Sequence, residues 1–381
     1  MQRMVVGMVS MLAKPVVPAG DEANMPLKVL PLQIIELQSG VLLKRGCTEF
    51  KVSGEGASKI VRQILSVAHA NGITREEICH TFPPEERKTV DTLVEQLVAR
   101  HLLVPSNKHT EPSNDGTESP LDILYWHFGQ SASQVLGQLN SHHFVIVGIN
   151  TISRQLAASL RESGVTNVTV VDDPRLRNLR FFDQDGNMNR ERWPSSLPFP
   201  LPWEDWERNQ HTQPLDCLVG TSDFGGQEEL RKWNSFCLAR SSHFLPIVLK
   251  NLIGYVGPLI IPGETACFEC LRMRQNAHME SPPIQRAAET AAFDGQHFIG
   301  YHPSMTSVLG TIAAFELTKF YSGVLPLWNV GTLLEVNLFT CQMTKRTVQK
   351  IPRCLVCSPL MSRPPITPHK TNFVPLTQET P

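Results

Sequence analysis

The chain has 381 residues, of which 41% are hydrophobic, so it is too long for one ordinary domain and can bury a sizeable core. Its 35 Lys and Arg residues nearly balance its 36 Asp and Glu residues. The net charge of −1 therefore excludes a global attraction to nucleic acid or to an anionic membrane. The nine cysteines, an odd number, argue against a disulfide framework, and we expect a reducing, cytoplasmic location.

Residues 1–26 lack a periodic pattern, and we expect them to be disordered. The alternative is a short signal sequence, because Arg3 precedes an apolar stretch from Met4 to Ala13. The single basic residue and the poor cleavage site that follows count against that alternative.

Residues 27–104 predict a small α+β module of the winged-helix type, with three short strands followed by three helices. Gly40 and Gly46 are expected to mark turns between strands. Thr74 with Glu77 three residues later has the pattern of a helix N-cap with a capping box. The expected strands cover residues 28–38, 40–46 and 48–55, and the expected helices cover residues 56–70, the segment after Thr74, and residues 83–104.

Residues 105–119 are polar and rich in Ser, Pro, Asn and Gly, which predicts a linker. We expect a second, α/β domain at residues 120–359 and a disordered tail at residues 360–381. This domain opens with a strand–helix–strand unit at residues 143–173, since two continuous apolar runs flank an amphipathic helix. The later elements expected are a helical lead-in at 120–139, a long loop at 183–213, strands within 214–220, 244–263 and 333–351, and a helix at 304–323 that Gly323 ends.

Two Cys-x-x-Cys pairs, Cys267 with Cys270 and Cys354 with Cys357, carry the strongest signal in the sequence. Four thiolates are a preferred ligand set for tetrahedral Zn²⁺, and a full protein shell makes such a site structural. A redox dithiol is the alternative, but it needs no second pair. We therefore predict a structural zinc that joins the end of the chain to the loop after residue 263.

The first strand of the α/β domain ends at a candidate nucleotide site. A dinucleotide fold offers Gly-x-Gly-x-x-Gly there, so that the backbone can approach phosphate. Gly148 is present, but Asn150 and Ser153 replace the later glycines. Asp172 ends the second strand, where an acidic residue would bind ribose hydroxyls, or where it would simply cap the next segment.

Together these features resemble the ThiF-like family, the fold of ubiquitin-activating and molybdopterin-adenylating enzymes, over about residues 140–358. The resemblance is carried by the opening unit with "VVDD", by "LVGTSD" and "GYVGPLIIPGETACFECLRMR", by the "TSVLGTIAAFELTKFYSG" helix, and by the closing "CLVC". It implies that Asp223 matches the aspartate near the metal and ATP.

The adenylating enzymes of that family also carry an Asn-Leu-x-Arg-Gln motif and a lysine. Asn178 and Leu179 remain here, whereas Phe181 and Phe182 occupy the Arg and Gln positions, and no lysine candidate follows. Without these charges, adenylyl transfer would go unstabilised. We expect no ATP binding and no catalytic residue, and we read Gly148, Asp172 and Asp223 as a degenerate nucleotide site.

Residues 27–104 resemble a PqqD-like precursor-peptide recognition element. That module followed by a degenerate ThiF-like domain is similar to the leader-peptide-binding proteins of azole- and azoline-forming peptide clusters, whose partner is a YcaO-type cyclodehydratase that binds ATP itself. In this interpretation the strand around residues 48–54 captures an extended leader by β-augmentation. The expected peptide contacts are Phe50, Val52, Leu93, Leu97 and Arg100, with ordinary core packing as the alternative for each apolar residue.

The predicted function is therefore that of a non-catalytic subunit that presents a ribosomal precursor peptide for thiazoline and oxazoline formation, with a homodimer through the sheet domain as a further option. The first alternative is an ATP-dependent adenylating enzyme that activates a carboxyl terminus. The second, an NAD-binding oxidoreductase, has a poor glycine pattern. Cys217 and Cys237 lie in apolar contexts, so we expect them to be core residues and not nucleophiles.

Overall fold

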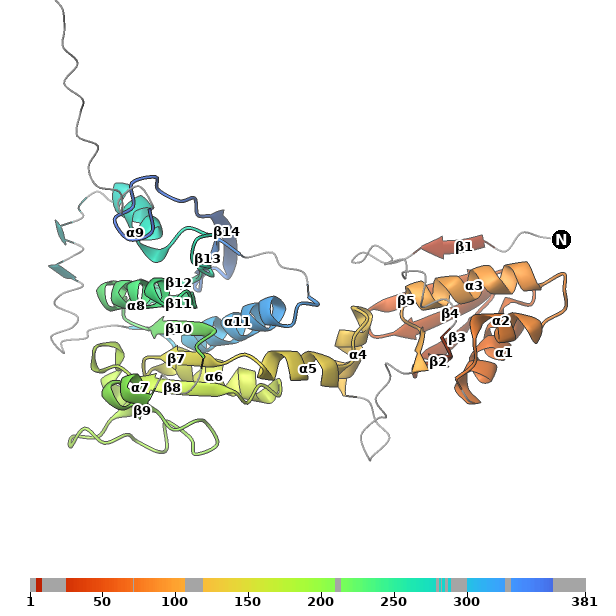
Figure 1. Ribbon diagram of the computed structural model, residues 1–381, viewed down its shortest axis with the longest axis horizontal. Helices are drawn as coiled ribbons and strands as arrows, with labels where there is room; N and C mark the ends of the chain where they lie inside the picture. The colour runs from red at the N-terminus through yellow and green to blue at the C-terminus, as the bar shows by residue number, and fades with distance from the viewer. Residues whose placement is uncertain are drawn as a thin grey trace, which may run out of the picture. The chain divides into compact units, whose positions relative to one another are not determined.

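The computed structural model describes residues 5–8, 25–70, 72–106, 119–209, 214–278, 281, 283–284, 287–288, 300–325 and 330–358. The chain forms two compact units (Figure 1). The first contains residues 1–141, 163–165 and 317–326, and the second contains residues 142–162, 166–316 and 327–381. The expected linker at 105–119 and tail at 360–381 fall almost wholly outside the described residues.

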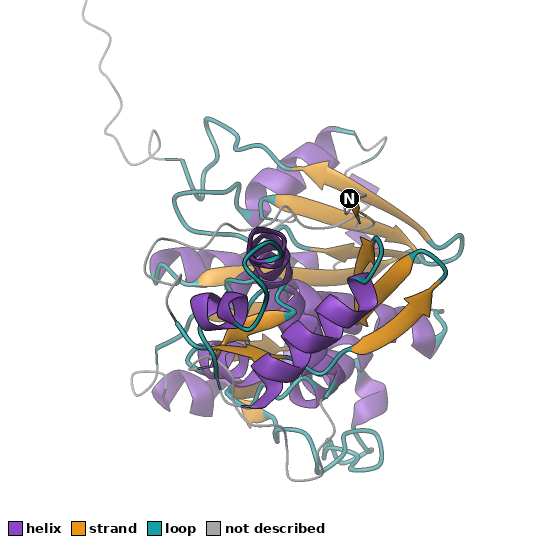
Figure 2. Ribbon diagram, turned by 90° about the vertical axis from the view of Figure 1, so that its right-hand side faces the viewer, coloured by secondary structure: helices purple, strands orange, loops and turns teal. Residues whose placement is uncertain are grey.

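The N-terminal unit has an antiparallel four-stranded sheet in the order β1-β5-β4-β3 and a two-stranded sheet of β2 and β6. Helix α1 contacts β2, β4 and β5, and Figure 2 shows helices of this unit in purple beside its strands in orange. The strands are β1 Val5–Met8, β2 Leu27–Val29, β3 Gln33–Leu37, β4 Gly40–Arg45, β5 Thr48–Ser53 and β6 Leu103–Pro105. The helices are α1 Ala57–Ala70, α2 Arg75–His80, α3 Arg87–Ala99, α4 Pro120–His127 and α5 Ala132–Asn140.

The capping box that the sequence predicts at α2 is present. Thr74 Oγ1 accepts a hydrogen bond from the Glu77 backbone N–H at 3.3 Å, and the Glu77 carboxylate accepts one from the Thr74 backbone N–H at 2.9 Å. Two donors at the helix start are thereby satisfied, which fixes where α2 begins.

Three boundaries in this unit differ from the expectation. The third helix ends at Ala99 and not at residue 104, because His101 has a left-handed φ of +53° and Leu103–Pro105 pairs with β2. The strand expected at 28–38 is divided into two strands around Pro31, which cannot donate to a ladder. Residues 5–8 form β1, although we expected 1–26 to be disordered; the other residues up to 24 lie outside the described part.

The helical lead-in at residues 120–139 belongs with the N-terminal unit, whereas we expected it in the α/β domain. Trp126 of α4 packs with Leu30 and Val104 in a small buried cluster. His127 Nδ1 lies 2.8 Å from Thr48 Oγ1 at the start of β5. Apolar burial and this hydrogen bond join α4 to the strands.

The second unit is built on an eight-stranded mixed sheet in the order β14-β13-β12-β11-β10-β7-β8-β9. Strands β11, β10, β7, β8 and β9 are parallel, and β12, β13 and β14 continue the sheet antiparallel. The strands are β7 Phe144–Val147, β8 Val168–Asp172, β9 Leu201–Pro202, β10 Cys217–Ser222, β11 His243–Lys250, β12 Ile253–Val256, β13 Thr332–Asn337 and β14 Gln342–Thr347. The helices are α6 Thr151–Glu162, α7 Trp203–Asn209, α8 Gln227–Ala239, α9 Phe268–Ala277 and α11 Pro303–Tyr321.

The predicted strand–helix–strand opening is observed as β7, α6 and β8, and β7 is fully buried as a parallel strand should be. Within the long loop expected at 183–213, the structure instead contains β9 and α7. Helix α7 forms there because Trp203 and Trp206 pack on Trp233 of α8, with ring centroids 4.5 and 6.1 Å away. In the described part of the chain, no helix is long and apolar enough to cross a membrane.

Candidate functional site: a four-cysteine cluster and a closed nucleotide position

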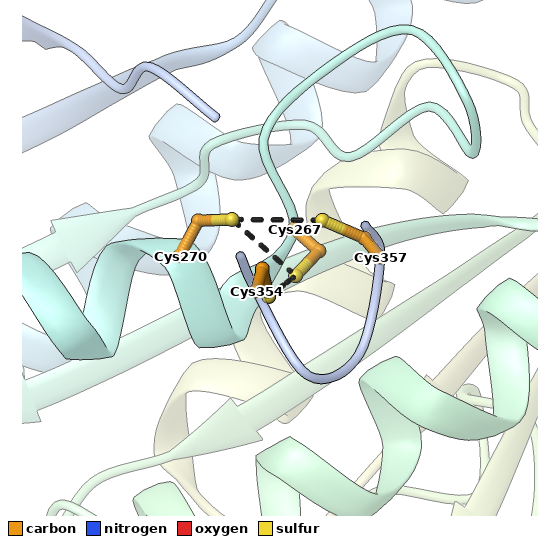
Figure 3. Close-up of side chains that lie close together, drawn as sticks. All are labelled: Cys267, Cys270, Cys354 and Cys357. Atoms are coloured by element: carbon orange, nitrogen blue, oxygen red, sulfur yellow. Dashed lines mark hydrogen bonds between the residues drawn. The ribbon is translucent and has the colours of Figure 1, made fainter. Parts of the chain in front are cut away.

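The four predicted metal ligands meet in one cluster (Figure 3). The Sγ atom of Cys267 lies 3.8 Å from that of Cys270 and 3.7 Å from that of Cys354. The Sγ atoms of Cys270 and Cys357 are 3.5 Å apart, and all four sulfurs lie within 4.8 Å of one another. A tetrahedral zinc with Zn–S bonds of about 2.3 Å separates its sulfurs by about 3.8 Å, so the cluster has the size that Zn²⁺ requires.

Two short backbone segments position the sulfurs. Cys267 is the N-cap residue of α9, and Cys270 lies in the first turn of that helix. The start of α9 is held by Asn234 of α8, whose Oδ1 accepts from the Phe268 backbone N–H at 3.0 Å. The opposing segment contains Cys354 and Cys357, and the backbone N–H of Ile351 donates to Cys270 Sγ at 3.4 Å.

The four sulfurs lie close enough together to hold a metal ion. Cys267, Cys270 and Cys354 are buried, and burial raises the pKa of the Cys267 thiol and raises the pKa of Cys357 to about 11. A bound cation reverses that effect, because it stabilises the thiolate. Four cysteine ligands would fill the tetrahedral coordination shell of a bound zinc, so no coordination position would remain open for water or substrate.

Gly148, Asp172 and Asp223 come together at the carboxyl ends of β7, β8 and β10. Strands β8 and β10 pair with opposite sides of β7, so the strand order reverses here, at the place where open α/β sheets bind ligands. Gly148 has φ +102°, and a Cβ there would lie 2.6 Å from the Thr221 carbonyl oxygen. The position therefore requires glycine.

The N-terminus of α6, where a phosphate would bind, is capped by the chain itself. The Asn150 backbone N–H donates to Ser153 Oγ and the Ser153 backbone N–H donates to Asn150 Oδ1, both at 3.0 Å. The Asn150 amide also donates to the carbonyl and hydroxyl oxygens of Thr221 at 3.2 and 3.0 Å. Asn150 and Ser153 are fully buried, so two of the backbone donors at the start of α6 are already satisfied.

The Asp172 carboxylate, expected at the ribose position, is bound by an arginine. Arg177 donates from Nε to Oδ1 and from Nη2 to Oδ2, each at 2.7 Å. The same guanidinium stacks on Phe182, 4.6 Å from its ring centroid. The acceptors that ribose hydroxyls would need are therefore occupied.

Asp223, which is 1% exposed, forms hydrogen bonds with the half-buried side chains of Asn178 and Tyr301. Its Oδ2 accepts from Asn178 Nδ2 at 2.7 Å and from the Tyr301 hydroxyl at 2.5 Å. Burial raises the pKa of Asp223, against the lowering effect of these two donors. Burial and the neighbouring carboxylate also raise the pKa of Tyr301.

The expected peptide-binding residues lie together on β5 and α3, but four of the five belong to the hydrophobic core of the module. Phe50, Val52, Leu93 and Leu97 are at most 2% exposed. Arg100, the C-cap residue of α3, lies with its guanidinium carbon 4.5 Å from the Phe50 ring centroid. The apolar side chains therefore point inward, and the backbone of β5 on the side away from β4 is paired with β1.

The sequence matches no family model and no curated relative. Solved structures do match. E. coli MccB superposes with a TM-score of 0.59 at 17% identity, over 88% of this chain and 97% of that of MccB. The chain has the fold of MccB. The heterocyclase TruD matches with a TM-score of 0.57 at 19% identity, over 88% of this chain but only 43% of that of TruD.

At these identities the likeness establishes the fold, and it confirms the predicted ThiF-like α/β domain preceded by a small β/α module. Among the MccB matches, one was crystallised with SeMet MccA and another with ATP. A further match is a heterocyclase in complex with substrate and cofactor.

Two residues that complete the site were not foreseen. Arg177 follows Asp172 by five residues, so a carboxylate–arginine pair across that turn could have been suspected from the sequence. Tyr301 lies 78 residues after Asp223 in a segment without a motif, and no sequence signal points to it. Cys217 and Cys237 are buried core residues, as predicted.

Proposed function

We propose that this chain binds the leader of a ribosomally made precursor peptide and presents it to a YcaO-type, ATP-dependent cyclodehydratase that forms thiazolines and oxazolines. The observation that carries the proposal is the backbone of β5. This strand already pairs antiparallel with one extended segment, Val5–Met8, beyond its partner β4. A strand edge that accepts an extended segment is the surface that β-augmentation uses.

The matched structures support this choice. MccB has been crystallised with MccA, and TruD is a heterocyclase. More than half of TruD has no counterpart in the present 381 residues, because the match covers 43% of that chain. In the proposal a separate cyclodehydratase supplies the missing part and binds the ATP.

The closed nucleotide position favours a recognition subunit over an adenylating enzyme. Adenylyl transfer needs positive charge and free backbone donors around the phosphates. Here the backbone N–H groups of Asn150 and Ser153 each donate to the side chain of the other residue, and the guanidinium of Arg177 is paired with Asp172. The chain would therefore contribute binding and orientation to the complex and leave triphosphate chemistry to its partner.

We also assign Zn²⁺ to the four-cysteine cluster. The ion would be held by Cys267, Cys270, Cys354 and Cys357, and it would supply structural support, because it joins α9 to the segment that follows β14. Such thiolate clusters persist in a reducing compartment, in keeping with the cytoplasmic location that we propose. Homodimerisation through the sheet domain is part of the same proposal.

Leader binding can be tested by fluorescence anisotropy with a labelled leader of the cognate precursor. We expect binding in the micromolar range and an affinity about tenfold lower for Arg100→Ala, which removes the side chain that stacks on Phe50 beside the edge. Arg62→Ala is the matched control, since Arg62 pairs with Glu36 on β3, at the other end of the sheet order. No binding at tens of micromolar, either by the wild-type chain or by a chain in which the pairing of Val5–Met8 with β5 is disrupted, would refute the proposal.

The alternative of adenylation is tested by ATP–pyrophosphate exchange on the purified chain. We expect no exchange, with or without the precursor peptide. Exchange by the chain alone, abolished by Asp223→Asn, would make the chain an adenylating enzyme.

A further inference from the structure

The segment that pairs with β5 belongs to the same chain. Strand β1 runs antiparallel to β5, with Val5 opposite Ser53 and Met8 opposite Phe50 (Figure 1). Four of the six residues of β5 therefore have a partner among the described residues on this side. Among the described strands, β1 is the outer member of the sheet at this end. The edge that the proposed function assigns to the leader is thus covered.

The pairing has the features of a cover that can be displaced. Over the described residues it spans four residue pairs, whereas β4 pairs with all six residues of β5. Gly7 lies inside β1, and glycine weakens a strand because it loses the most conformational freedom and has no side chain to pack. Residues 9–24 tether β1 to the module, so its pairing is intramolecular and does not depend on protein concentration.

We propose that Val5–Met8 is a built-in competitor of the leader, which occupies the β5 edge until a leader displaces it. This inference rests on the proposed function. If this is so, the observed affinity for the leader equals the intrinsic affinity multiplied by the fraction of molecules in which β1 has left the β5 edge. It also predicts the form of the ligand: an extended, mainly apolar and uncharged segment that runs antiparallel to β5, as "VVGM" does.

The test uses Gly7→Pro in the full-length chain. Proline removes a backbone N–H and fixes φ, so it disrupts the four-residue strand and opens the edge. Ala13→Pro is the matched control, since it places a proline in the same N-terminal stretch outside β1. The probe is a fluorescein-labelled synthetic peptide of residues 1–12, MQRMVVGMVSML, and the same peptide with proline at position 7 is the negative probe.

We expect the Gly7→Pro chain to bind this probe at least tenfold more tightly than the wild-type and Ala13→Pro chains. Hydrogen exchange of the amides in Thr48–Ser53 should be faster in Gly7→Pro and return to the wild-type rate when the peptide is added. Equal affinity and equal exchange in all three chains would overturn the inference. Loss of cooperative unfolding of the module in Gly7→Pro would also overturn it, because β1 would then be a permanent structural strand.

Measuring the binding of a cognate leader to both chains distinguishes a failure of this inference from a failure of the proposed function. If the leader binds wild-type and Gly7→Pro chains equally well, the competitor is refuted and leader binding stands. If the Gly7→Pro chain binds the 1–12 peptide more tightly than the wild-type chain but the leader binds neither chain, then β1 is confirmed as a displaceable strand and the proposed function is refuted.

Discussion

Arg177 binds both carboxylate oxygens of Asp172, with Nε–Oδ1 and Nη2–Oδ2 distances of 2.7 Å. The pair lies at the end of β8, where a ribose-binding acid stands in dinucleotide folds. Phe182 forms the platform on which the guanidinium stacks. The Asp172 carboxylate, which could bind a ligand, is thus bound by a side chain of the protein itself.

We expect Arg177→Ala to lower the free energy of unfolding by about 1–3 kcal/mol, because a nearly buried carboxylate loses both of its donors. Arg177→Lys should lose less, since an ammonium keeps the charge but not the bidentate geometry. Urea unfolding followed by tryptophan fluorescence measures both. Arg208→Ala is the control, because its pair with Asp205 is exposed and should contribute little. A loss no larger than that of the control would contradict a structural role for Arg177.

The cysteine cluster should contain about one zinc ion per chain, measured by inductively coupled plasma mass spectrometry. Cys354→Ser should release the metal and lower Tm by on the order of 10 °C, because zinc binding contributes directly to folding. Cys341→Ser serves as the control, since this thiol is exposed and outside the cluster. A Cys354→Ser chain with unchanged Tm and metal content would exclude the assignment.

Asp223 makes stability depend on pH in a defined direction. Its pKa is raised in the fold by burial, so the native state keeps a proton that the unfolded state releases. The stability that depends on this proton is full below the ordinary aspartate pKa of about 4 and is lost as pH rises through the folded value. Compared with Asp223→Asn, the wild-type chain should therefore become progressively less stable from about pH 4 upward, as chemical denaturation across that range would reveal.

Tyr301→Phe provides the matched variant for this measurement. Loss of the Tyr301 hydroxyl removes a donor that lowers the pKa of Asp223, so the folded-state pKa rises and the loss of stability should continue to higher pH. A stability difference between the wild-type and Asp223→Asn chains that does not change with pH would contradict the assigned environment.

Mg²⁺–ATP should not stabilise the chain, because the donors and acceptors at the nucleotide position are already used. A ligand that binds only the folded state raises Tm by an amount set by its concentration relative to Kd. At about 1 mM ATP we expect no shift by differential scanning fluorimetry. A shift of several degrees that Asp223→Asn removes would mean that the position still opens to nucleotide.

Short-range patterns made several elements predictable. The capping box at Thr74 and Glu77 marked the start of α2, and Gly323, with φ +66°, lies two residues beyond the end of α11. Both signals act within one helical turn, where local hydrogen bonding and backbone freedom decide the outcome. Helix α7 was missed because packing of its tryptophans against α8 stabilises it, and the sequence does not show which residues will be neighbours.

The amino-acid sequence by itself determined the four-cysteine cluster and the α/β architecture, since thiol spacing and buried apolar runs are properties of short segments. Only the tertiary structure decided what surrounds Asp223 and what pairs with β5. Tyr301 reaches Asp223 and Val5–Met8 reaches β5 across long stretches of chain. Whether a donor or a strand edge is free depends on what folding brings against it, and that information is not contained in any local pattern.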